Sequence, residues 1–539
     1  MPTTQHYDTD DGLSERIATL EATVAALEAT VAALTAENTA LRETVAKQDA
    51  LIRKYQAMLF GTKSEKGPPV AMATPTDTEA TPALQPTAPP PSPHSPSPRG
   101  QRRGAPGHGR RLYEELPPRE EVHDLPEKER RCPMCGESYL ACGSEDASEV
   151  EWEVTIQRVI HRRLKYRSAC ACQAPVLLTA PPPPKLIPKG LLAVSAVANL
   201  LVNKYLHGQP INRQLNELAL LCGVRFAPGT VVGVQDKVGE LLRPLYDATL
   251  LHLREADHWN ADETRWMQYG DETKHRWWLW VFASQDAVAF VLDPARSRAV
   301  PRRVFGLDDE TADARRATGI ISCDRWKSYQ GLPGLQTAYC WAHVRRDFTD
   351  LAKGYPRLLG EWTRAWVERI ALLYHLTAQR TRCDPGAEAF RRADMRLRNH
   401  VAAIARARDD ERADETLLHD ARAALDSMAR HWHGLTLFLD HPAVPLDNNE
   451  AERLLRTGVV GRKNFYGSGS LSSGALTEAA YTVLLTAAKN GLNPLTYLRA
   501  YLDACAANGG NAPDDLDRFL PWQATAKDRA AWQLPPNAA

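Results

Sequence analysis

The chain has 539 residues, which is too long for one hydrophobic core, so we expect several domains. Hydrophobic residues make up 43%, but 66 basic residues balance 66 acidic ones, and DNA binding must therefore be argued from local basic clusters. No segment approaches the length of an apolar membrane span and the N-terminus lacks the build of a signal peptide, which predicts a cytoplasmic protein. Ten cysteines, four of them in two close pairs, favour a metal site over a disulfide framework.

The first predicted element is a coiled coil over residues 13–58. Apolar residues recur at two positions of a seven-residue repeat: leucine at one (Leu13, Leu20, Leu27, Leu34, Leu41) and mainly β-branched residues at the other (Ile17, Val24, Val31, Asn38, Val45, Ile52). Leucine at one position with β-branched residues at the other favours a parallel dimer, and a single Asn in the seam fixes its register. An amphipathic helix folded onto its own domain is the alternative. We expect a homodimer.

Residues 67–112 are predicted to be a disordered linker. Pro, Ala, Thr and Ser dominate residues 67–98, and such a composition cannot bury a core. Basic residues cluster at the end of the linker, namely Arg99, Arg102, Arg103, Arg110 and Arg111. This cluster is either a solvated tail or a contact to a phosphate backbone, and its position does not separate the two.

Two close cysteine pairs predict a zinc-binding domain over residues 113–180. The pairs are Cys132 with Cys135, in a Cys-Pro-Met-Cys-Gly knuckle, and Cys170 with Cys172. Four such thiolates hold one structural Zn²⁺ tetrahedrally. Because one residue separates the second pair where two are usual, Cys142 or His161 is an alternative ligand. The alternating segment 150–160 predicts a hairpin between the pairs, and the basic run 158–167 suits a phosphate backbone.

Residues 185–250 are predicted to be helical and to resemble a helix-turn-helix. One helix begins at Ile211 and ends near Cys222, and another begins at Pro228. Plain helical packing is equally consistent with this pattern, because the second helix has few side chains suited to base edges. Both interpretations stay open.

From residue 257 the pattern changes to strands. Five β-rich runs cover residues 257–264, 276–282, 287–292, 319–323 and 336–341, with a basic helix after the third. Three strands, a helix, a strand, a helix and a strand is the order of a ribonuclease-H-like fold, in which the first and fourth strands are neighbours. Asp262 and Asp324 would then lie side by side. The predicted class is multidomain α+β, with a catalytic core at 255–350 and 445–505 and a helical insertion at 351–440.

The run from Leu446 to Arg456 predicts a capped helix that carries a third acid. Asp447 is a good N-cap, and Glu452 and Arg456 fall on one helix face four residues apart. Taken alone, this pattern predicts a surface helix with an ion pair. Together with the two aspartates at 262 and 324, Glu452 completes three carboxylates that can hold a pair of divalent metal ions.

Basic side chains near these acids are candidates for contact with DNA phosphates. They are His343, Arg345, Arg346, Arg456, Arg462 and Lys463. For each of them a surface salt bridge is the ordinary alternative. Residues 461–467 combine basic and aromatic side chains that suit DNA, and the last twenty residues, 520–539, are predicted to be disordered.

The motifs of this chain follow one another in a specific order, although each is weak by itself. They are the zipper, the run Phe60 to Lys66, the Cys132 knuckle, Lys204-Tyr205 with Pro210 to Gln214, Asp262-Glu263-Thr264, Asp324 with Tyr329, Cys340 to His343 with Arg345-Arg346, and Asp447 to Asn449 with Ala451-Glu452-Arg453. In this order they resemble the transposases of the insertion-sequence sixty-six family of bacterial mobile elements. The resemblance covers the chain from about Leu13 to about Pro494.

The resemblance implies a DDE transposase in which Asp262, Asp324 and Glu452 bind two Mg²⁺ or Mn²⁺ ions. Glu452 matches better than Glu450, because the acid of the family precedes Arg. The implied partners are double-stranded DNA, at the element ends and at the target, and helper proteins of the same element. Arg325 is a departure, since the family usually has Gly there. The alternatives are a catalytically inert, zinc-dependent, dimeric DNA-binding protein and a nuclease that only hydrolyses DNA.

Overall fold

The computed structural model describes residues 10–60, 133–138, 156–167, 177–273, 275–308 and 317–533. The chain divides into two compact units, each of which is described by itself. The larger unit comprises residues 1–67, 183–216 and 226–533, and the smaller one residues 68–182, 217–225 and 534–539. The fold is of mixed α+β class, with one mixed five-stranded sheet and one two-stranded sheet in the described ranges.

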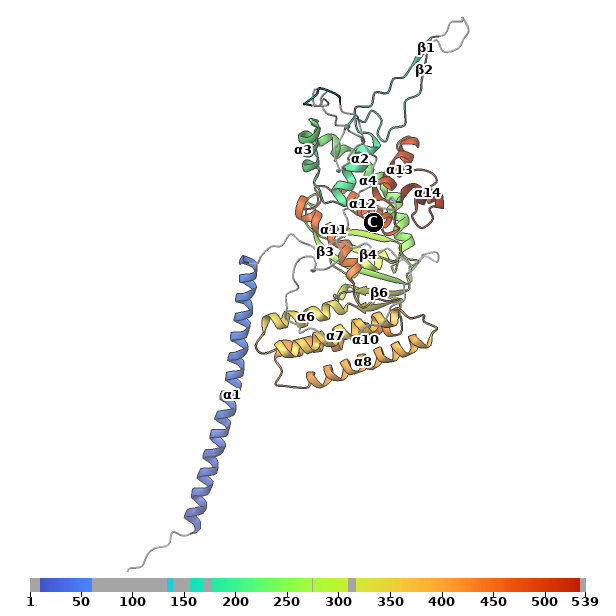
Figure 1. Cartoon of the computed structure of the whole chain (residues 1–539). Coiled ribbons are helices and arrows are strands. Elements are labelled where there is room, and N and C mark those ends of the chain that lie inside the picture. Colours follow the sequence, from blue (N-terminus) through green and yellow to red (C-terminus); the bar gives the residue numbers. More distant parts are fainter. Residues whose placement is uncertain are drawn as a thin grey trace, which may run out of the picture. The chain divides into compact units, whose positions relative to one another are not determined.

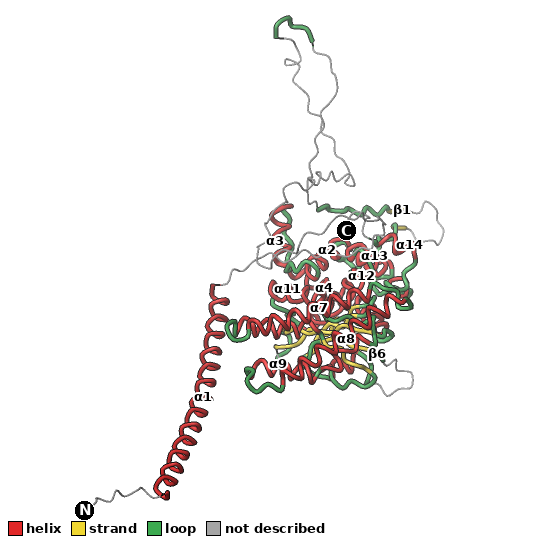
Figure 2. Tube along the Cα trace, turned by 60° about the horizontal axis from the view of Figure 1, so that its bottom comes forward, coloured by secondary structure: helices red, strands yellow, loops and turns green. Residues whose placement is uncertain are grey.

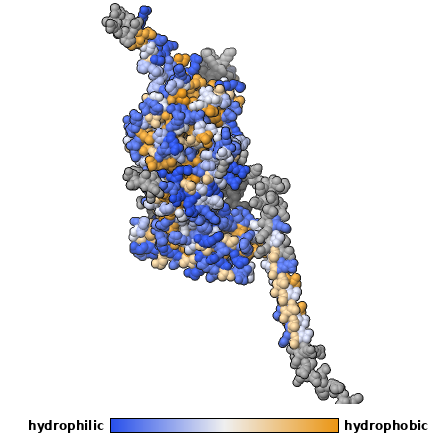
Figure 3. All heavy atoms as spheres, turned by 180° about the vertical axis from the view of Figure 1, so that it is seen from behind, coloured by the Kyte–Doolittle hydropathy of each residue, from blue (hydrophilic) through white to orange (hydrophobic). Residues whose placement is uncertain are grey.

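Helix α1 (Asp10–Phe60) carries the predicted heptads. Its apolar positions Leu20, Val24, Leu27, Val31 and Leu34 are between 52% and 64% exposed (Figure 3). The stretch Ala18–Ala40 is long and apolar enough to cross a membrane, so the expectation that no segment approaches such a span is wrong. That stretch contains three glutamates, however, and carboxylates are costly in lipid. The heptad repeat is therefore the better account of its apolar residues.

The two-stranded sheet belongs to the smaller unit. Its strands β1 (Lys165–Arg167) and β2 (Leu177–Thr179) pair antiparallel. Residues 156–160 form no strand, so the predicted hairpin is wrong for them, while residues 150–155 lie outside the described ranges. The side chains of 156–160 are exposed, and an alternating segment becomes a strand only where a partner pairs with its backbone.

The five-stranded sheet is the centre of the larger unit. Its strands are β3 (His258–Met267), β4 (Arg276–Ala283), β5 (Val288–Asp293), β6 (Gly319–Cys323) and β7 (Leu335–Tyr339). They lie in the order β5-β4-β3-β6-β7, with β3, β4 and β5 antiparallel and β3, β6 and β7 parallel. The expected pairing of the first and fourth strands is confirmed.

Helix α12 (Leu471–Lys489) closes the β5 edge of this sheet. Its side chains Thr486, Thr482 and Glu478 accept hydrogen bonds of 2.6–3.0 Å from three backbone N–H groups of β5. Because the three acceptors recur every four residues, they share one helix face and meet alternate residues of the strand. The edge strand is thereby prevented from pairing with another chain, and all six of its residues are buried.

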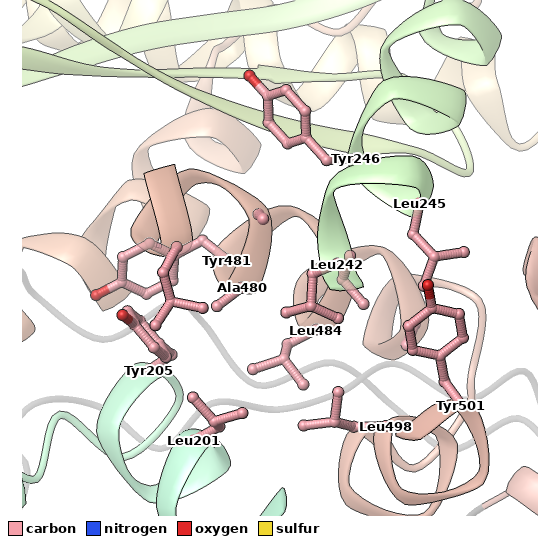
Figure 4. Close-up of a cluster of buried hydrophobic side chains, with 14 of the residues drawn as sticks. Leu201, Tyr205, Leu242, Leu245, Tyr246, Ala480, Tyr481, Leu484, Leu498 and Tyr501 are labelled. Atoms are coloured by element: carbon pink, nitrogen blue, oxygen red, sulfur yellow. The ribbon is translucent and has the colours of Figure 1, made fainter. Parts of the chain in front are cut away.

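Helices cover both faces of the sheet (Figure 2). On one face lie α4 (Pro228–Leu253), α11 (Asn449–Phe465) and α12, joined by α2 (Val194–Tyr205) and α13 (Pro494–Ala507) in one apolar core. Figure 4 shows side chains of α2, α4, α12 and α13 converging in this core. On the other face, α5 (Ala299–Val304) and the 3-10 helix η2 (Lys327–Tyr329) cover three large aromatic residues, Trp259, Trp280 and Phe282.

The pair of helices predicted as helix-turn-helix-like consists of α3 (Ile211–Cys222) and α4. Gly223 follows α3 with a φ of +66°, a backbone conformation that favours glycine. Helix α4 runs for 26 residues and buries Val238, Leu241 and Leu245 in the core. A helix packed along its length in this way is a core element, which supports the plain packing alternative for α4.

Residues 341–439 form a run of helices that packs around its own core. The helices are α6 (Trp341–Gly354), α7 (Gly360–Thr381), α8 (Glu388–Arg412), α9 (His419–Arg430), α10 (Trp432–Thr436) and η3 (Leu437–Leu439). In Figure 1 they lie beyond β6, at the β7 side of the sheet. Helix α10 touches β7 closely, because a Cβ on Gly434 would lie 2.4 Å from the Thr337 carbonyl oxygen.

The C-terminal segment is ordered as far as Gln533, so the predicted disorder over 520–539 is wrong for residues 520–533. The segment contains η4 (Asp517–Phe519) and α14 (Ala526–Trp532). Trp532 is 3% exposed and stacks on Phe519 with ring centroids 5.6 Å apart. Its burial in the core of the larger unit fixes a segment whose composition resembles a tail.

Candidate active site

Asp262 and Asp324 lie where the pairing of β3 with β6 ends. The last pair of the two parallel strands is Asn260 opposite Ser322. Asp262 lies on β3 two residues beyond this pair, and Asp324 lies two residues beyond Ser322, directly after β6. Side chains two residues apart point to the same face of a strand, so Asp262 shares the face of Asn260. That face is covered by α11, because Asn260 donates to Glu450 of this helix.

The three predicted acids act on one another electrostatically. The pKa of Asp262 is raised to about 7 in total, mainly by burial and next by the neighbouring carboxylate of Glu263. The charges of Asp324 and Glu452 raise this pKa further, whereas a hydrogen bond of 2.9 Å from the Glu263 N–H lowers it. Such mutual repulsion favours a cation at the same place.

Asp324 begins the loop between β6 and η2. Its Oδ1 accepts a hydrogen bond of 2.9 Å from the Trp326 backbone N–H, which holds the carboxylate in the turn. The neighbouring Arg325 side chain points to the helical run and binds Ser427 at 2.9 Å and Asp347 at 2.5 Å. The Arg that replaces the usual Gly therefore has partners of its own away from the acids.

Glu452 lies in the first turn of α11 and faces α6. Its Oε1 is 3.7 Å from His343 Nε2 and 3.8 Å from Arg346 Nη2. The ion pair expected between Glu452 and Arg456 is not among the salt bridges of the described residues. The carboxylate turns to α6 instead, and both of its cations are too distant for hydrogen bonds.

His343 is close to Glu452 and feels the charge of Asp324 as well. Burial lowers its pKa and Arg346 lowers it further, whereas the charges of Glu452 and Asp324 raise it. Its Nδ1 is buried without a hydrogen-bond partner in the part of the chain that the structure describes. The ring favours its neutral form, in which one nitrogen donates and the other accepts a hydrogen bond.

Asn448, rather than Asp447, is the N-cap of α11. Asp447 accepts a hydrogen bond of 3.2 Å in the turn before the helix. The side chain of Asn448 is 1% exposed and donates through Nδ2 to the Ala261 carbonyl oxygen at 2.7 Å, while its backbone N–H donates to Cys340 Sγ at 3.3 Å. The predicted N-cap, Asp447, is therefore wrong by one residue, because the hydrogen bond to the β3 carbonyl fixes Asn448 at the start of the helix. These bonds join the helix of Glu452 to the residue before Asp262.

Both carboxylate oxygens of Glu450, the other acid of the motif, have partners within the protein. One of its oxygens pairs with Lys489 and the other accepts a hydrogen bond of 3.0 Å from Asn260 Nδ2. Glu452 has no contact as close as these among the described residues. This difference supports Glu452 as the acid that is free to bind a ligand.

Glu263 points to the opposite face of the sheet from Asp262. Its carboxylate accepts hydrogen bonds from Arg296 Nε at 2.6 Å and from the Tyr329 hydroxyl, and its side chain is 0% exposed. The sequence motifs contained Glu263 and Tyr329, but their spacing assigned no role to either. The structure gives them a shared role in fixing the strand that carries Asp262.

The predicted DNA-binding residues differ in their surroundings. The exposed ones are Arg345, Arg346, Arg456 and Lys463. His343 is partly buried beside the acids, as described above. Arg462 donates through Nη1 to Thr264 Oγ1 at 3.1 Å and to the Arg265 carbonyl oxygen, so its guanidinium helps to hold α11 on β3.

No three His, Cys, Asp or Glu side chains converge closely enough to hold a metal ion within the described ranges. The donor set at Asp262, Asp324 and Glu452 is nevertheless the one that hard divalent cations prefer, since it consists of carboxylate oxygens. Burial is the main cause of the raised pKa of Asp262, and the charges of Glu263, Asp324 and Glu452 raise it as well, so a bound cation would favour the charged form.

The chain matches the model of the family described as "Transposase IS66 family" over residues 189–475, which is more than half of its length. The chain belongs to the IS66 transposase family. It is also similar to the uncharacterized protein y4jD of Sinorhizobium fredii (strain NBRC 101917 / NGR234), at 26% identity over 419 residues, covering 75% of this chain and 80% of the relative. Uncharacterized protein y4hP of the same strain is 23% identical over 425 residues, covering 73% of each chain.

The match to the IS66 transposase family contains all three acids, the five-stranded sheet and the helices α6 to α11. Helix α1 and the cysteine pairs lie outside the matched residues. Of the predicted zinc ligands, Cys132, Cys170 and Cys172 lie outside the described ranges, and Cys135 is an exposed free cysteine. The alternative ligand Cys142 is also outside them, and His161 is exposed.

Proposed function

We propose that this member of the IS66 transposase family is an active DNA transposase of the DDE type. It would cut a DNA strand at each end of a bacterial insertion sequence and join the freed ends to target DNA. The proposal is carried by the parallel pairing of β3 with β6, which sets the strand of Asp262 beside the strand that Asp324 follows. The charges of Asp324 and Glu452 are also among the causes that raise the pKa of Asp262. The strand order β5-β4-β3-β6-β7, with the first and fourth strands paired, supports a ribonuclease-H-like core.

Two Mg²⁺ or Mn²⁺ ions are the proposed cofactors of this site. Asp262, Asp324 and Glu452 are the residues that would hold them. When bound, such ions neutralise the charge that develops on the entering and leaving oxygens of an in-line displacement. The fit rests on the chemistry of the donors: three carboxylates lie within electrostatic reach of one another, and Glu452 has no cation at hydrogen-bonding distance among the described residues.

The reaction has two steps at one site. In the first, the oxygen of a water molecule bonds to the scissile phosphorus, the 3′ oxygen leaves, and it takes up the proton that the water loses. In the second, this 3′ hydroxyl attacks a phosphorus of the target, and the displaced target oxygen takes the proton. His343 is the group that can hold a proton beside the acids, because its neutral ring has one nitrogen directed to Glu452 and one without a partner in the described residues.

The substrate is double-stranded DNA, and the exposed arginines around the acids would bind its phosphates. Arg345 and Arg346 lie on α6, and Arg456 and Lys463 lie on α11. Guanidinium groups suit phosphates because they donate two parallel hydrogen bonds. These exposed basic side chains lie on the two helices that carry His343 and Glu452, and such positive charge attracts a polyanion.

Dimerisation through α1 would bring two such sites together. The exposed apolar positions of α1 recur with the heptad period, and a parallel partner helix would bury them. One Zn²⁺ held by Cys132, Cys135, Cys170 and Cys172 is proposed as a structural ion. Helper proteins of the same element remain proposed partners.

A strand-transfer assay tests the proposed function. Purified full-length protein is incubated in Mg²⁺ or Mn²⁺ with labelled duplexes that carry the inverted repeats flanking its gene, together with a target plasmid. We expect nicked and joined products from the wild type, no products from Glu452→Gln, and products from Glu450→Gln. The two variants remove one charge each, two residues apart on α11, so they form a matched pair.

Each negative outcome of this assay has a distinct meaning. Binding of the duplex with no cleavage in either metal would contradict the enzyme and indicate an inert DNA-binding dimer. Cleavage without joined products would indicate a nuclease that only hydrolyses DNA. Equal activity of Glu452→Gln and wild type would remove Glu452 from the site.

A further inference from the structure

A cavity of about 310 Å³ opens between α6, α7 and the turn that precedes α11. It contains none of the three acids. Its polar lining consists of Arg345, Arg346, Thr349, Tyr374, Asp447 and Asn449. Arg346 connects the cavity with the candidate active site, because the same guanidinium lies 3.8 Å from Glu452 Oε1. The side chain of Arg346 therefore separates the cavity from Glu452.

One wall of the cavity is strongly basic. Arg345 and Arg346 are consecutive residues of α6, and both are exposed. Arg345 has no ion-pair partner among the described residues, and the carboxylate near Arg346 is beyond hydrogen-bonding distance. Arg345 without an ion pair and Arg346 with only a long one leave a positive charge on this wall, and such a wall attracts an anion.

The facing wall supplies a hydroxyl from the helical run. Burial raises the pKa of Tyr374, the charge of Asp447 raises it further, and that of Arg345 lowers it, so this α7 residue lies near both walls. The hydroxyl therefore stays protonated and can donate a hydrogen bond. Burial also raises the pKa of Asp447, and the hydrogen bond from Asn449 lowers it. Asp447 is the one acid that lines the cavity, against two arginines.

The size and lining of the cavity restrict its ligand. A cavity of about 310 Å³ is too small for a DNA duplex to enter. The residues that line the cavity are mostly charged or polar, and Tyr374 is the aromatic side chain among them. A single anionic group such as a phosphate is small enough for the cavity. It also matches the hydrogen-bond donors there, because a guanidinium and a phenol hydroxyl both donate to phosphate oxygens.

We propose that this cavity binds one phosphodiester of the substrate DNA, within one or two nucleotides of the phosphate that is cut. Arg345 and the Tyr374 hydroxyl would be its ligands. Arg346 would contact the same strand between this cavity and Glu452. The inference rests on the proposed function, since the triad defines which phosphate is cut.

The proposal gives the helical run a part in substrate positioning. Tyr374 comes from α7, far in the sequence from both α6 arginines and from α11. A second fixed phosphate beside the scissile one sets the direction of the strand, because one contact leaves it free to rotate. Correct alignment of the attacking and leaving oxygens requires such a constraint.

A coupled substitution of protein and DNA tests this inference. Single phosphates near the cleavage point are replaced, one at a time, by neutral methylphosphonates, and binding of each duplex is measured with full-length protein without added Mg²⁺. We expect one position at which the replacement weakens wild-type binding about 10-fold. At that position the same replacement should weaken DNA binding by Arg345→Ala less than about 2-fold, since this variant has already lost the side chain that contacts the phosphate. Tyr374→Phe should reduce the coupling at the same position.

Arg364→Ala is the matched control, because Arg364 is an exposed arginine of α7 that does not line the cavity. This variant should keep the full methylphosphonate effect. Equal methylphosphonate effects in wild type and Arg345→Ala at every position would overturn the proposal, as would a loss of coupling in Arg364→Ala. Because binding is measured without cleavage, DNA cutting in Mg²⁺ with no coupling would leave the proposed function standing and remove only the cavity.

Discussion

Asp262 and Glu263 are consecutive acids of β3 with opposite surroundings. The carboxylate of Glu263, on one face of the sheet, is hydrogen-bonded by Arg296 and Tyr329. The carboxylate of Asp262, on the other face, accepts a hydrogen bond from the Glu263 N–H and otherwise lies near the charges of Asp324 and Glu452. One face thus neutralises its acid within the protein, and the other gathers acids together.

This difference separates an acid that serves the fold from one that serves a ligand. A buried charge is stabilised when a cation and hydrogen bonds offset part of its lost hydration, as on the Glu263 face, where burial raises the pKa of Glu263 and the bonds from Tyr329 and Arg296 lower it. A group of acids without such compensation lowers the stability of the protein and is kept where a ligand completes it. Each prediction below changes one of the residues on which this difference depends.

The largest effect is expected for Asp262→Asn. The variant keeps the shape of the side chain but cannot supply the charge, so strand cleavage should fall by about 10³-fold or more, on the order of 4 kcal/mol. Binding of the uncut duplex should stay within about 2-fold of wild type. Gel assays of cleavage and of binding on one preparation measure both. Cleavage within 10-fold of wild type would refute a role for this charge.

Glu263→Gln should act on the fold instead. The variant leaves Arg296, whose side chain is 27% exposed, beside an uncharged partner, and breaking a pair whose carboxylate is fully buried costs about 3 kcal/mol. The midpoint of thermal unfolding should fall accordingly. Adding Arg296→Met should restore part of the loss, because the unpaired charge is then absent. An unchanged midpoint in the single variant would show that this ion pair does not hold the strand.

Asn448→Ala should impair catalysis more than it impairs folding. Loss of the bond to the Ala261 carbonyl oxygen frees α11 to move against β3, and we expect about 30-fold slower cleavage, or about 2 kcal/mol. Asn464→Ala is the control, since Asn464 ties the other end of α11 to the Gly208 carbonyl oxygen at 2.9 Å. The control should lose similar stability but little activity. Equal activities would argue against Asn448 as a positioning residue.

The smallest effect is a gain of stability in Asp262→Asn without metal. The pKa of Asp262 is raised from 3.8 to about 7 in the folded protein, so its contribution to stability is full below pH 3.8 and is lost as the pH rises through 7. At pH 8 the charged carboxylate destabilises the folded protein, and the neutral variant should be more stable by about 1–2 kcal/mol.

Thermal unfolding at pH 8 and at pH 4 measures this gain. The difference between variant and wild type should disappear at pH 4, and added Mg²⁺ should stabilise the wild type more than the variant. A variant that is less stable than wild type at pH 8 would contradict the account of crowded, uncompensated acids.

The sequence predicted the sheet well, because each strand has a local signal. Aromatic and β-branched runs such as Arg276–Ala283 are strands in most surroundings. The order of elements then predicted that β3 and β6 pair, and with it the approach of Asp262 and Asp324. The partners of Glu452 were out of reach, because His343 and Arg346 come from a helix more than one hundred residues earlier.

Other failures have the same physical origin. The side chain of Asn448 is bound by a strand carbonyl that no local pattern reveals, so Asp447 was the better local cap. The C-terminal Trp532 becomes ordered through burial against Phe519, whereas composition alone indicated a tail. Tyr374 reaches the cavity only after α7 has packed against α6, and its helix gives no sign of this contact.

Binding of Mn²⁺ to purified full-length protein, followed by electron paramagnetic resonance, tests the shared metal site most directly. We predict that the wild type binds Mn²⁺ and that Asp262→Asn, Asp324→Asn and Glu452→Gln each weaken this binding at least about 10-fold, while Glu450→Gln retains it. Unweakened Mn²⁺ binding in any of the first three variants would contradict a site built from these three carboxylates.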